Sequence, residues 1–253
     1  MVLDMTDKEE LWNLAASFLK QLEDSGEEFV FQDERRVETV SVEAAEIKRN
    51  AAETGETLKE FARRVSSCTR CRLHKSRTNL VFGAGDPNAD LMFVGEGPGR
   101  EEDRQGLPFV GASGKLLTKI IASIGFSRIE VFIGNMVKCR PPGNRDPLPD
   151  EIEACEEYLL TQIRMIKPKV IVTLGRYSAA YFHGREAPMR ELRGVVADFN
   201  GVKVVSSYHP AALLRNPAFK RGTWEDMILA RKVYDEQGGR PSSGEVYRSR
   251  SGK

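Results

Sequence analysis

The amino-acid sequence predicts an α/β protein with three layers (α/β/α), in which a central, mostly parallel four-stranded sheet lies between helices. Two observations support this fold: four short runs rich in apolar and β-branched residues, and amphipathic segments of helical length among them. Apolar strands that alternate with helices form parallel sheets covered on both faces. In such sheets a ligand binds beyond the carboxyl ends of the strands, so the residues that follow each run are candidate site residues.

The predicted strands are residues 90–97 (DLMFVGEG), 130–139 (EVFIGNMVKC), 169–175 (KVIVTLG) and 202–210 (VKVVSSYHP). Apolar residues at helical spacing predict helices over 113–126, 150–166 and 223–237. Thr223 is the expected N-cap of the last helix, because a threonine side chain can accept hydrogen bonds from the first turn.

The charge distribution divides the chain into an acidic leader and a basic body. Residues 1–60 contain sixteen acidic and seven basic side chains, whereas the rest of the chain contains 21 acidic and 31 basic ones. We expect an acidic extension at 1–57 (one helix over 8–23 and a flexible linker), a folded domain at 58–237 and a disordered basic tail at 238–253. The basic body suits a phosphate-bearing partner, although a solvated surface has the same composition. The sequence does not identify a partner for the N-terminal helix.

No apolar run reaches the roughly eighteen residues of a membrane span, and the N-terminus lacks the basic and apolar regions of a signal peptide. The sequence therefore predicts an intracellular, cytoplasmic protein with no membrane segment.

Four cysteines are candidate metal ligands. Cys68 and Cys71 form a C-x2-C motif, and Cys139 and Cys155 lie far downstream. Intracellular proteins rarely use cysteines for disulfides, and two thiolates at this spacing can turn toward one metal centre. The spacing favours a [4Fe–4S] cluster, which accepts scattered cysteines, over structural zinc, which usually uses two local pairs. Small buried hydrophobic residues without a metal are the third interpretation of Cys139 and Cys155.

The segment 95–117 is rich in glycine but matches neither common nucleotide-binding pattern. Arg100 stands where the third glycine of G-x-G-x-x-G belongs, and Phe109 stands where the first glycine of a phosphate-binding loop belongs. Glycines at a strand end instead let the backbone approach a flat ligand, with Glu96 and Glu102 close by.

Several motifs together resemble the family 4 uracil-DNA glycosylases, the iron–sulfur branch of that superfamily. They are CTRCRLH, GEGPGREED, GLPFVGASGKLL, GNMVKCRPPGNRDP and HPAALLRNP, with a cysteine sixteen positions after Cys139, and they extend from Cys68 to Pro217 in the order of the family. The resemblance implies that 58–237 is a monomeric catalytic domain of the same fold. Its activity would be hydrolysis of the N-glycosidic bond of uracil in single- or double-stranded DNA, which leaves an abasic site and starts base excision repair. The resemblance also implies one [4Fe–4S] cluster with four ligands, Cys68, Cys71, Cys139 and Cys155.

The resemblance assigns roles to individual residues of the uracil pocket. His209 would hydrogen-bond uracil O2 and stabilise the negative charge that develops on the base. Asn135 would pair with O4 and N3–H, and Phe109 would stack on the flipped base. The backbone of Gly95 and Gly97 would approach the ring. The group that orients the attacking water is expected to be Glu96, with Glu102 second; Glu102 could instead exclude thymine at the C5 edge.

Residues after His209 would contact DNA. Ala212, Leu213 and Leu214 are the expected wedge that fills the space left by the flipped base, and Arg215 would hold a phosphate. Arg70, Arg72, His74 and Lys75 stand beside the predicted cluster and could also meet phosphates. The segment 140–154 contains no histidine that could trap the sugar covalently, so we expect ordinary turnover.

Two other functions stay open at this point. The first is a catalytically inactive DNA-binding scaffold of the same fold, and the second is a zinc-stabilised nucleotide-processing enzyme. The expected cluster is structural, because hydrolysis transfers no electrons.

Overall fold

The computed structural model of the chain describes residues 37–38 and 55–243. The predicted helix over 8–23, most of the predicted linker and residues 244–253 of the predicted tail lie outside the described residues.

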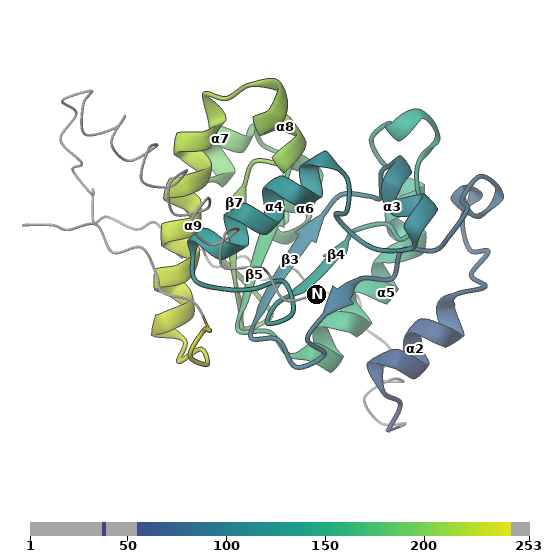
Figure 1. The fold of residues 1–253 in the computed structure, drawn as a ribbon, viewed down its shortest axis with the longest axis horizontal. Helices are drawn as coiled ribbons and strands as arrows, with labels where there is room; N and C mark the ends of the chain where they lie inside the picture. The colour runs from purple at the N-terminus through teal and green to yellow at the C-terminus, as the bar shows by residue number, and fades with distance from the viewer. Residues whose placement is uncertain (1–36, 39–54, 244–253) are drawn as a thin grey trace, which may run out of the picture.

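The described strands form one sheet of seven strands in the order β1-β6-β7-β5-β3-β4-β2 (Figure 1). The four central strands are parallel to one another and correspond to the four predicted ones: β3 (Leu91–Gly95), β4 (Phe132–Asn135), β5 (Val170–Leu174) and β7 (Val202–Ser207). The α/β prediction with a mostly parallel centre is thus confirmed.

The sheet is wider than the predicted four strands because short strands extend both edges. They are β2 (Ala84–Gly85), antiparallel to β4; β6 (Val196–Phe199), antiparallel to β7; and β1 (Val37–Glu38), parallel to β6. The strands β1 and β2, with two residues each, carry too few side chains to show the period of two that identifies a strand in a sequence.

Helices surround the sheet. The described ones are α2 (Leu58–Val65), α3 (Arg100–Gln105), α4 (Ala112–Ser123), α5 (Pro149–Ile166), α6 (Arg176–His183), α7 (Met189–Leu192), α8 (Pro210–Arg215) and α9 (Phe219–Glu236), with 3-10 turns η1 (Arg72–Lys75) and η2 (Pro142–Asn144). None of them is long and apolar enough to cross a membrane.

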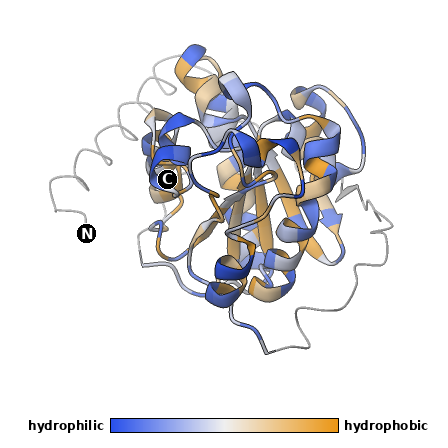
Figure 2. Cartoon of the chain, turned by 90° about the vertical axis from the view of Figure 1, so that its right-hand side faces the viewer, coloured by the Kyte–Doolittle hydropathy of each residue, from blue (hydrophilic) through white to orange (hydrophobic). Residues whose placement is uncertain are grey.

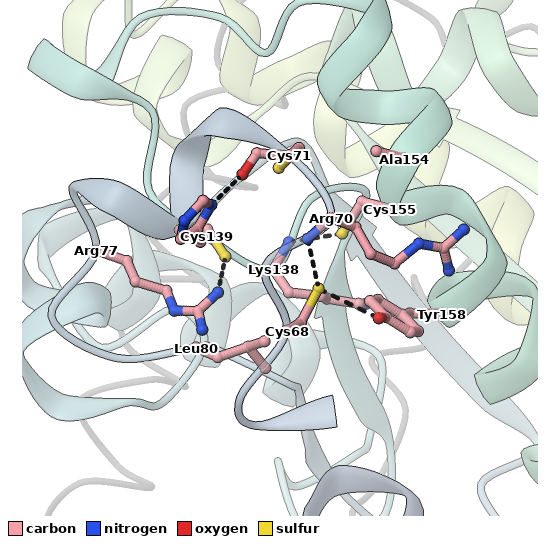
Figure 3. A pocket seen from close by; sticks show the side chains of 11 residues that line it. Cys68, Arg70, Cys71, Arg77, Leu80, Lys138, Cys139, Ala154, Cys155 and Tyr158 are labelled. Atoms are coloured by element: carbon pink, nitrogen blue, oxygen red, sulfur yellow. Dashed lines mark hydrogen bonds between the residues drawn. The ribbon is translucent and has the colours of Figure 1, made fainter. Parts of the chain in front are cut away.

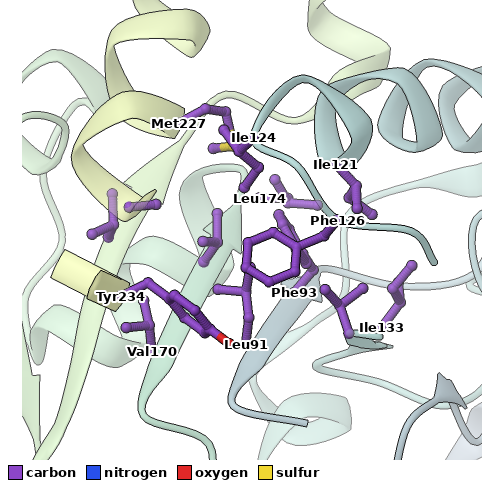
Figure 4. Close-up of a cluster of buried hydrophobic side chains, with 14 of the residues drawn as sticks. Leu91, Phe93, Ile121, Ile124, Phe126, Ile133, Val170, Leu174, Met227 and Tyr234 are labelled. Carbon is purple, nitrogen blue, oxygen red and sulfur yellow. The ribbon is translucent and has the colours of Figure 1, made fainter. Parts of the chain in front are cut away.

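The two faces of the sheet bury separate hydrophobic clusters. Leu91 and Phe93 of β3 point toward α4 and α9, whereas Met92 and Val94 point toward α5 and α6. Figure 4 shows the first cluster, with Tyr234 and Met227 of α9 over the strands, and Figure 2 shows apolar strands between helices whose outer faces are hydrophilic. Because successive side chains of a strand alternate between faces, a fully apolar strand requires helices on both sides.

Helix α9 begins one turn before its predicted start. Thr223 is therefore not the N-cap; it lies inside the helix, 3% exposed, and its hydroxyl donates to the Phe219 carbonyl at 3.0 Å. A hydroxyl that bonds to the preceding turn is compatible with a helix interior, so a threonine alone does not fix a helix start.

The predicted tail begins at residue 238, but residues 238–243 are bonded to the body. Arg240 donates to the carboxylates of Asp86 and Asp90 at 3.0 and 3.1 Å, and the Ser243 backbone donates to Glu130 at 2.8 Å. Asp90 directly precedes β3, so this contact lies at the end of the sheet opposite to the carboxyl ends of the parallel strands.

Candidate active site and cysteine pocket

The register of β3 and β4 brings two predicted site segments together. Gly95 pairs with Asn135 as the last residues of their strands, and the backbone contact continues beyond them. Met136 donates to the Gly95 carbonyl at 2.9 Å, and Val137 donates to the Glu96 carbonyl at 3.1 Å. The glycine-rich segment and the asparagine segment therefore form one edge of the site.

Asn135 presents an unpaired acceptor inside the protein. Its side chain is 1% exposed, and Oδ1 has no hydrogen-bond partner in the described part of the chain. Buried polar groups are nearly always hydrogen-bonded, because an unpaired one costs about 1–3 kcal/mol. A ligand with an N–H group at this position would remove that cost.

Gly95 is the point at which the asparagine and the phenylalanine meet. A Cβ atom on Gly95 would lie 2.5 Å from Asn135 Oδ1 and 2.6 Å from Phe109 Cζ. Only glycine leaves enough space there for these two side chains.

Phe109 is held in an uncommon backbone conformation. Its φ is +51°, in the left-handed region that non-glycine residues rarely adopt. Its carbonyl packs so closely on α4 that a Cβ atom on Gly114 would lie 1.9 Å from it. Conformations of this kind persist only where the surrounding structure fixes them, and they are common at functional sites.

Glu102 fixes the same loop. Its Oε1 accepts hydrogen bonds from the backbone N–H groups of Val110 and Gly111 at 2.8 and 2.9 Å. A carboxylate that accepts two backbone hydrogen bonds is committed to that loop. Glu102 therefore holds the segment after Phe109.

His209 faces the ring of Phe109. The two ring centroids are 5.6 Å apart, and the planes are tilted by 31°. The Nδ1 atom accepts a hydrogen bond from the Ala211 backbone N–H at 3.1 Å, so the proton of a neutral ring is on Nε2. Burial, with the nearby positive charge of Arg215, lowers the pKa of His209 to about 4. The ring is thus a neutral donor at physiological pH.

Glu96 follows β3 and is bonded to the first turn of α6. Its Oε1 accepts from the Tyr177 backbone N–H at 2.9 Å. Burial raises the pKa of Glu96, and the hydrogen bond from Tyr177 opposes that rise. Gly175 has a φ of +106°, and a Cβ atom there would lie 2.5 Å from Glu96 Oε1, so this glycine lets the carboxylate reach the helix.

Tyr177 is a site residue that the sequence interpretation missed. In addition to its backbone bond to Glu96, its hydroxyl donates to Asp146 at 2.9 Å. The signal was present in LGRYS, a strand end followed by a helix, but no side chain in it is typical of a particular chemistry.

Helix α8 separates the predicted wedge residues. Leu213 is 2% exposed and belongs to the core, so in this structure it does not face outward as the predicted wedge would. Leu214 is 52% exposed, Arg215 is also exposed and Ala212 is half-buried. Adjacent residues of a helix point about 100° apart, so one leucine anchors α8 while the next faces outward.

All four cysteines line one pocket, between the loop before η1, the end of β4 and helix α5 (Figure 3). Their thiols are free, with Cys139 and Cys155 buried and Cys68 and Cys71 half-buried. In the part of the chain that the structure describes, no three His, Cys, Asp or Glu side chains are grouped so that they could hold a single metal ion.

Hydrogen-bond donors surround the sulfurs. Arg77 donates to Cys139 at 3.1 Å, and the Tyr158 hydroxyl donates to Cys68 at 3.2 Å. Burial raises the pKa of the Cys155 thiol to about 11, while nearby Lys138 acts in the opposite direction. Donors of this kind favour sulfur in its anionic form, which is the form that binds iron. The donors from Arg77 and Tyr158 would therefore suit cysteine thiolates that hold a metal centre.

Two of the basic residues beside the pocket are paired within the protein. Arg70 forms an ion pair with Glu157 at 2.6 Å, and Arg72 forms one with Asp150 at 2.7 Å. Both carboxylates belong to α5, so these arginines join the C-x2-C loop to the helix that carries Cys155. Both arginine side chains remain exposed, so the expectation that they meet phosphates stays a prediction.

Comparison with known proteins finds uracil-DNA glycosylases, both as a family profile and as individual relatives. A profile of the Uracil DNA glycosylase superfamily matches residues 82–229. The Type-4 uracil-DNA glycosylase of Archaeoglobus fulgidus is 47% identical over 173 residues, which are 65% of this chain and 87% of that protein. The Type-4 uracil-DNA glycosylase of Thermotoga maritima is 44% identical over 190 residues, 73% of this chain and 99% of that protein. The one of Sulfurisphaera tokodaii is 46% identical over 187 residues, 70% and 85% of the two chains.

Proposed function

The chain belongs to the uracil-DNA glycosylase superfamily and to its type-4 enzymes, and on that premise we propose that it removes uracil from DNA. It hydrolyses the N-glycosidic bond and leaves an abasic site, at which base excision repair begins. The resemblance noted in the sequence is thus confirmed at the level of the family.

The unpaired Oδ1 atom of Asn135 is the observation that carries the proposal. Uracil offers an N–H donor at N3 and a carbonyl acceptor at O4, and a carboxamide can bind both. Cytosine has an acceptor at N3 and an amino group at position 4, so the same amide in the same orientation does not fit it. Gly95 and Phe109 beside Asn135 support a flat ligand that lies against the backbone and stacks on a ring.

The base leaves with the electrons of the glycosidic bond. As C1′–N1 breaks, N1 and the two carbonyl oxygens share the negative charge, and the sugar becomes oxocarbenium-like. The neutral His209 ring donates from Nε2 to O2 and stabilises this anion without having transferred its proton first. Its low pKa is appropriate to that role, because a neutral donor remains a donor over the physiological pH range.

Water then attacks C1′ of the sugar. We assign its orientation to Glu96, whose carboxylate is held by the first turn of α6. The water oxygen bonds to C1′, and one of its protons passes to the carboxylate or to solvent. A carboxylate near the developing sugar cation also stabilises the transition state by its charge.

Exposed residues of α8 are suited to DNA. Leu214 would fill the space left by the flipped uracil, and Arg215 would bind an adjacent phosphate. We propose that residues 58–237 act as a monomer on single- or double-stranded DNA, within the cell and away from membranes. We propose that the acidic extension at 1–57 lies outside the catalytic domain.

We also propose that Cys68, Cys71, Cys139 and Cys155 hold one [4Fe–4S] cluster. The cluster would supply covalent links among three chain segments and no catalytic step. The shared pocket, the free thiols and the donors from Arg77 and Tyr158 support this assignment.

The test is release of uracil from defined oligonucleotides by the purified protein, with a thymine-mismatch control. Asn135→Ala should release uracil about 100-fold more slowly or worse. A site that is built to hydrogen-bond its substrate depends strongly on that bond, and the alanine variant cannot form it. Its stability should not fall in proportion, since Oδ1 has no partner to lose. A wild-type protein that binds DNA and releases no uracil would be the inactive scaffold, and zinc in place of iron would favour the nucleotide-processing enzyme.

A further inference from the structure

Lys138 is a buried cation between the base-reading strand end and the cysteine pocket. Its side chain is 0% exposed, and the residue lines the pocket (Figure 3). A buried ammonium group is costly unless its protons are hydrogen-bonded. Its partners therefore indicate why a lysine stands here.

The ammonium group binds two neutral acceptors. It donates to the Asn135 backbone carbonyl at 2.8 Å and to Gln162 Oε1 at 2.6 Å. Gln162 is itself 0% exposed, and its Nε2 donates to the Phe82 carbonyl at 2.8 Å. That second bond fixes the amide orientation, so Oε1 points toward Lys138 and forms a rigid support for it.

The backbone of Lys138 is fixed by the same helix. Its N–H donates to Cys155 Sγ at 3.3 Å. Cys155 and Gln162 are seven residues apart on α5 and therefore lie on one face of it, two turns apart. Helix α5 thus supplies two acceptors to Lys138. Cys155 Sγ accepts from the Lys138 backbone N–H, and Gln162 Oε1 accepts from the Lys138 ammonium group.

From these contacts we propose that Lys138 is a positioning residue for base recognition, which fixes the Asn135 backbone against α5 so that the asparagine amide keeps its reading orientation. The inference rests on the proposed function, because it assigns to Asn135 the role of reading the base. It also links the two sites, because the Lys138 backbone N–H contacts Cys155 Sγ and its ammonium group contacts the Asn135 carbonyl.

Lys138→Met tests this role, because methionine fills a similar apolar volume and removes the ammonium donors. We expect kcat for uracil release to fall about 10- to 100-fold. A loss of this size is typical when a residue that contacts the substrate is displaced by up to about 1 Å. The Kd for DNA with an abasic site should stay close to wild type, since that DNA lacks the base that Asn135 would contact. Titration with free uracil should show a similar fold-loss of affinity.

Iron content and visible absorbance separate positioning from support of the cluster. The proposal requires that Lys138→Met keep its iron and lose its rate. It is overturned if kcat per iron-loaded protein equals the wild-type value, or if iron and activity are lost in the same proportion.

Gln162 provides a second variant in case Lys138→Met does not fold. Gln162→Met leaves the ammonium group with the Asn135 carbonyl and should weaken uracil affinity by a smaller factor. Gln162→Glu keeps an acceptor for the ammonium group but loses the donor to the Phe82 carbonyl, so its loss of uracil affinity should be smaller than that of Gln162→Met. Wild-type uracil affinity in Gln162→Met would contradict the proposal. If the wild-type protein released no uracil, the proposed function would fail, and titration with free uracil would still decide the role of Lys138.

Discussion

The ring of Phe109 lies 5.6 Å from the ring of His209, centroid to centroid, with 31° between the planes. Phe109 comes from the loop between α3 and α4, and His209 comes from the carboxyl end of β7. The candidate uracil pocket therefore depends on tertiary packing of α4 and α8 on the sheet, and changes far from the rings can disturb it.

Gly114→Ala should disturb Phe109 from the side of helix α4. The new Cβ would lie 1.9 Å from the Phe109 carbonyl oxygen and 2.0 Å from its carbonyl carbon, and backbone atoms cannot move aside cheaply. We expect the free energy of unfolding to fall by about 1–3 kcal/mol, the usual range for overpacking, and uracil release to slow. Denaturant unfolding and single-turnover excision measure the two effects.

Gly134→Ala is the matched control. Its Cβ would have its nearest neighbour at 3.6 Å, an ordinary contact, although Gly134 is also buried. Equal losses in the two variants would show that the close packing of Phe109 on α4 is not important.

Leu214→Ala should affect excision from double-stranded DNA more than from single-stranded DNA. An exposed wedge is needed only where a base leaves a stacked duplex, and unstacking costs a few kcal/mol per step, so we expect a loss of about tenfold with duplex substrate. Stability should be unchanged, because Leu214 is 52% exposed.

Leu213→Ala, in contrast to Leu214→Ala, is expected to lower the stability of the protein. Truncation of this leucine, 2% exposed, should lower the free energy of unfolding by about 2–5 kcal/mol. Equal effects of the Leu214 substitution on both substrates would count against a wedge, whatever Leu213→Ala does.

Cys155→Ala should remove one ligand of the proposed cluster, destabilise the fold and abolish the brown colour expected of an iron–sulfur protein. Iron analysis and the visible spectrum are the measurements. Tyr158→Phe is the control, since it removes the hydroxyl that donates to Cys68 at 3.2 Å and keeps all four thiols. A Cys155→Ala protein with unchanged absorbance would refute the ligand assignment.

His209 should make the protein less stable in acid. Its pKa is lowered from 6.5 to about 4 in the folded state, so between these pH values the unfolded chain binds a proton that the folded protein does not. The folded state therefore loses stability as the pH falls from about 6.5 to 4. Asp226 has a pKa raised to about 6 by burial, and it acts in the opposite direction below that pH.

The measurement is a series of thermal unfolding curves from pH 7 to pH 4. In His209→Gln the acid destabilisation should be reduced, because the contribution of Asp226 remains while that of His209 is gone. An identical pH profile in the variant and the wild type would mean that the pKa of His209 is not lowered in the folded state.

The sequence was most informative about the central strands and about the residues that follow them. The four central strands were predicted because runs such as LMFV and VIVTL have no polar face. The position of Asn135 and His209 at the carboxyl ends of their strands followed from the rule for parallel sheets, whereas Phe109 came from the family resemblance. The family resemblance supplied the individual roles. Neighbouring leucines could not be separated in this way, because helical spacing does not show that Leu213 packs inward until the position of α8 on α4 is known.

Other site features depend on partners remote in the sequence. Glu96 meets Tyr177, and Lys138 meets Gln162, through contacts that only the packing of α6 and α5 on the sheet creates. No local pattern marks these pairs. The ion pairs of Arg70 and Arg72 carry no local signal for the same reason, since their carboxylate partners on α5 lie about eighty residues away.

The short interval from Asn135 to Cys139 acts as a spacer of fixed length. Adding or deleting one residue there would shift the Cys139 thiol relative to the Asn135 amide. A change in the length of this segment would therefore disturb the uracil pocket and the cysteine pocket together. The turn of Asn200 and Gly201, with φ values of +52° and +86°, joins β6 and β7 at the far end of the sheet. Peptide insertions, such as an epitope or a fluorophore-labelling sequence, should be accommodated at that turn with little effect on either centre.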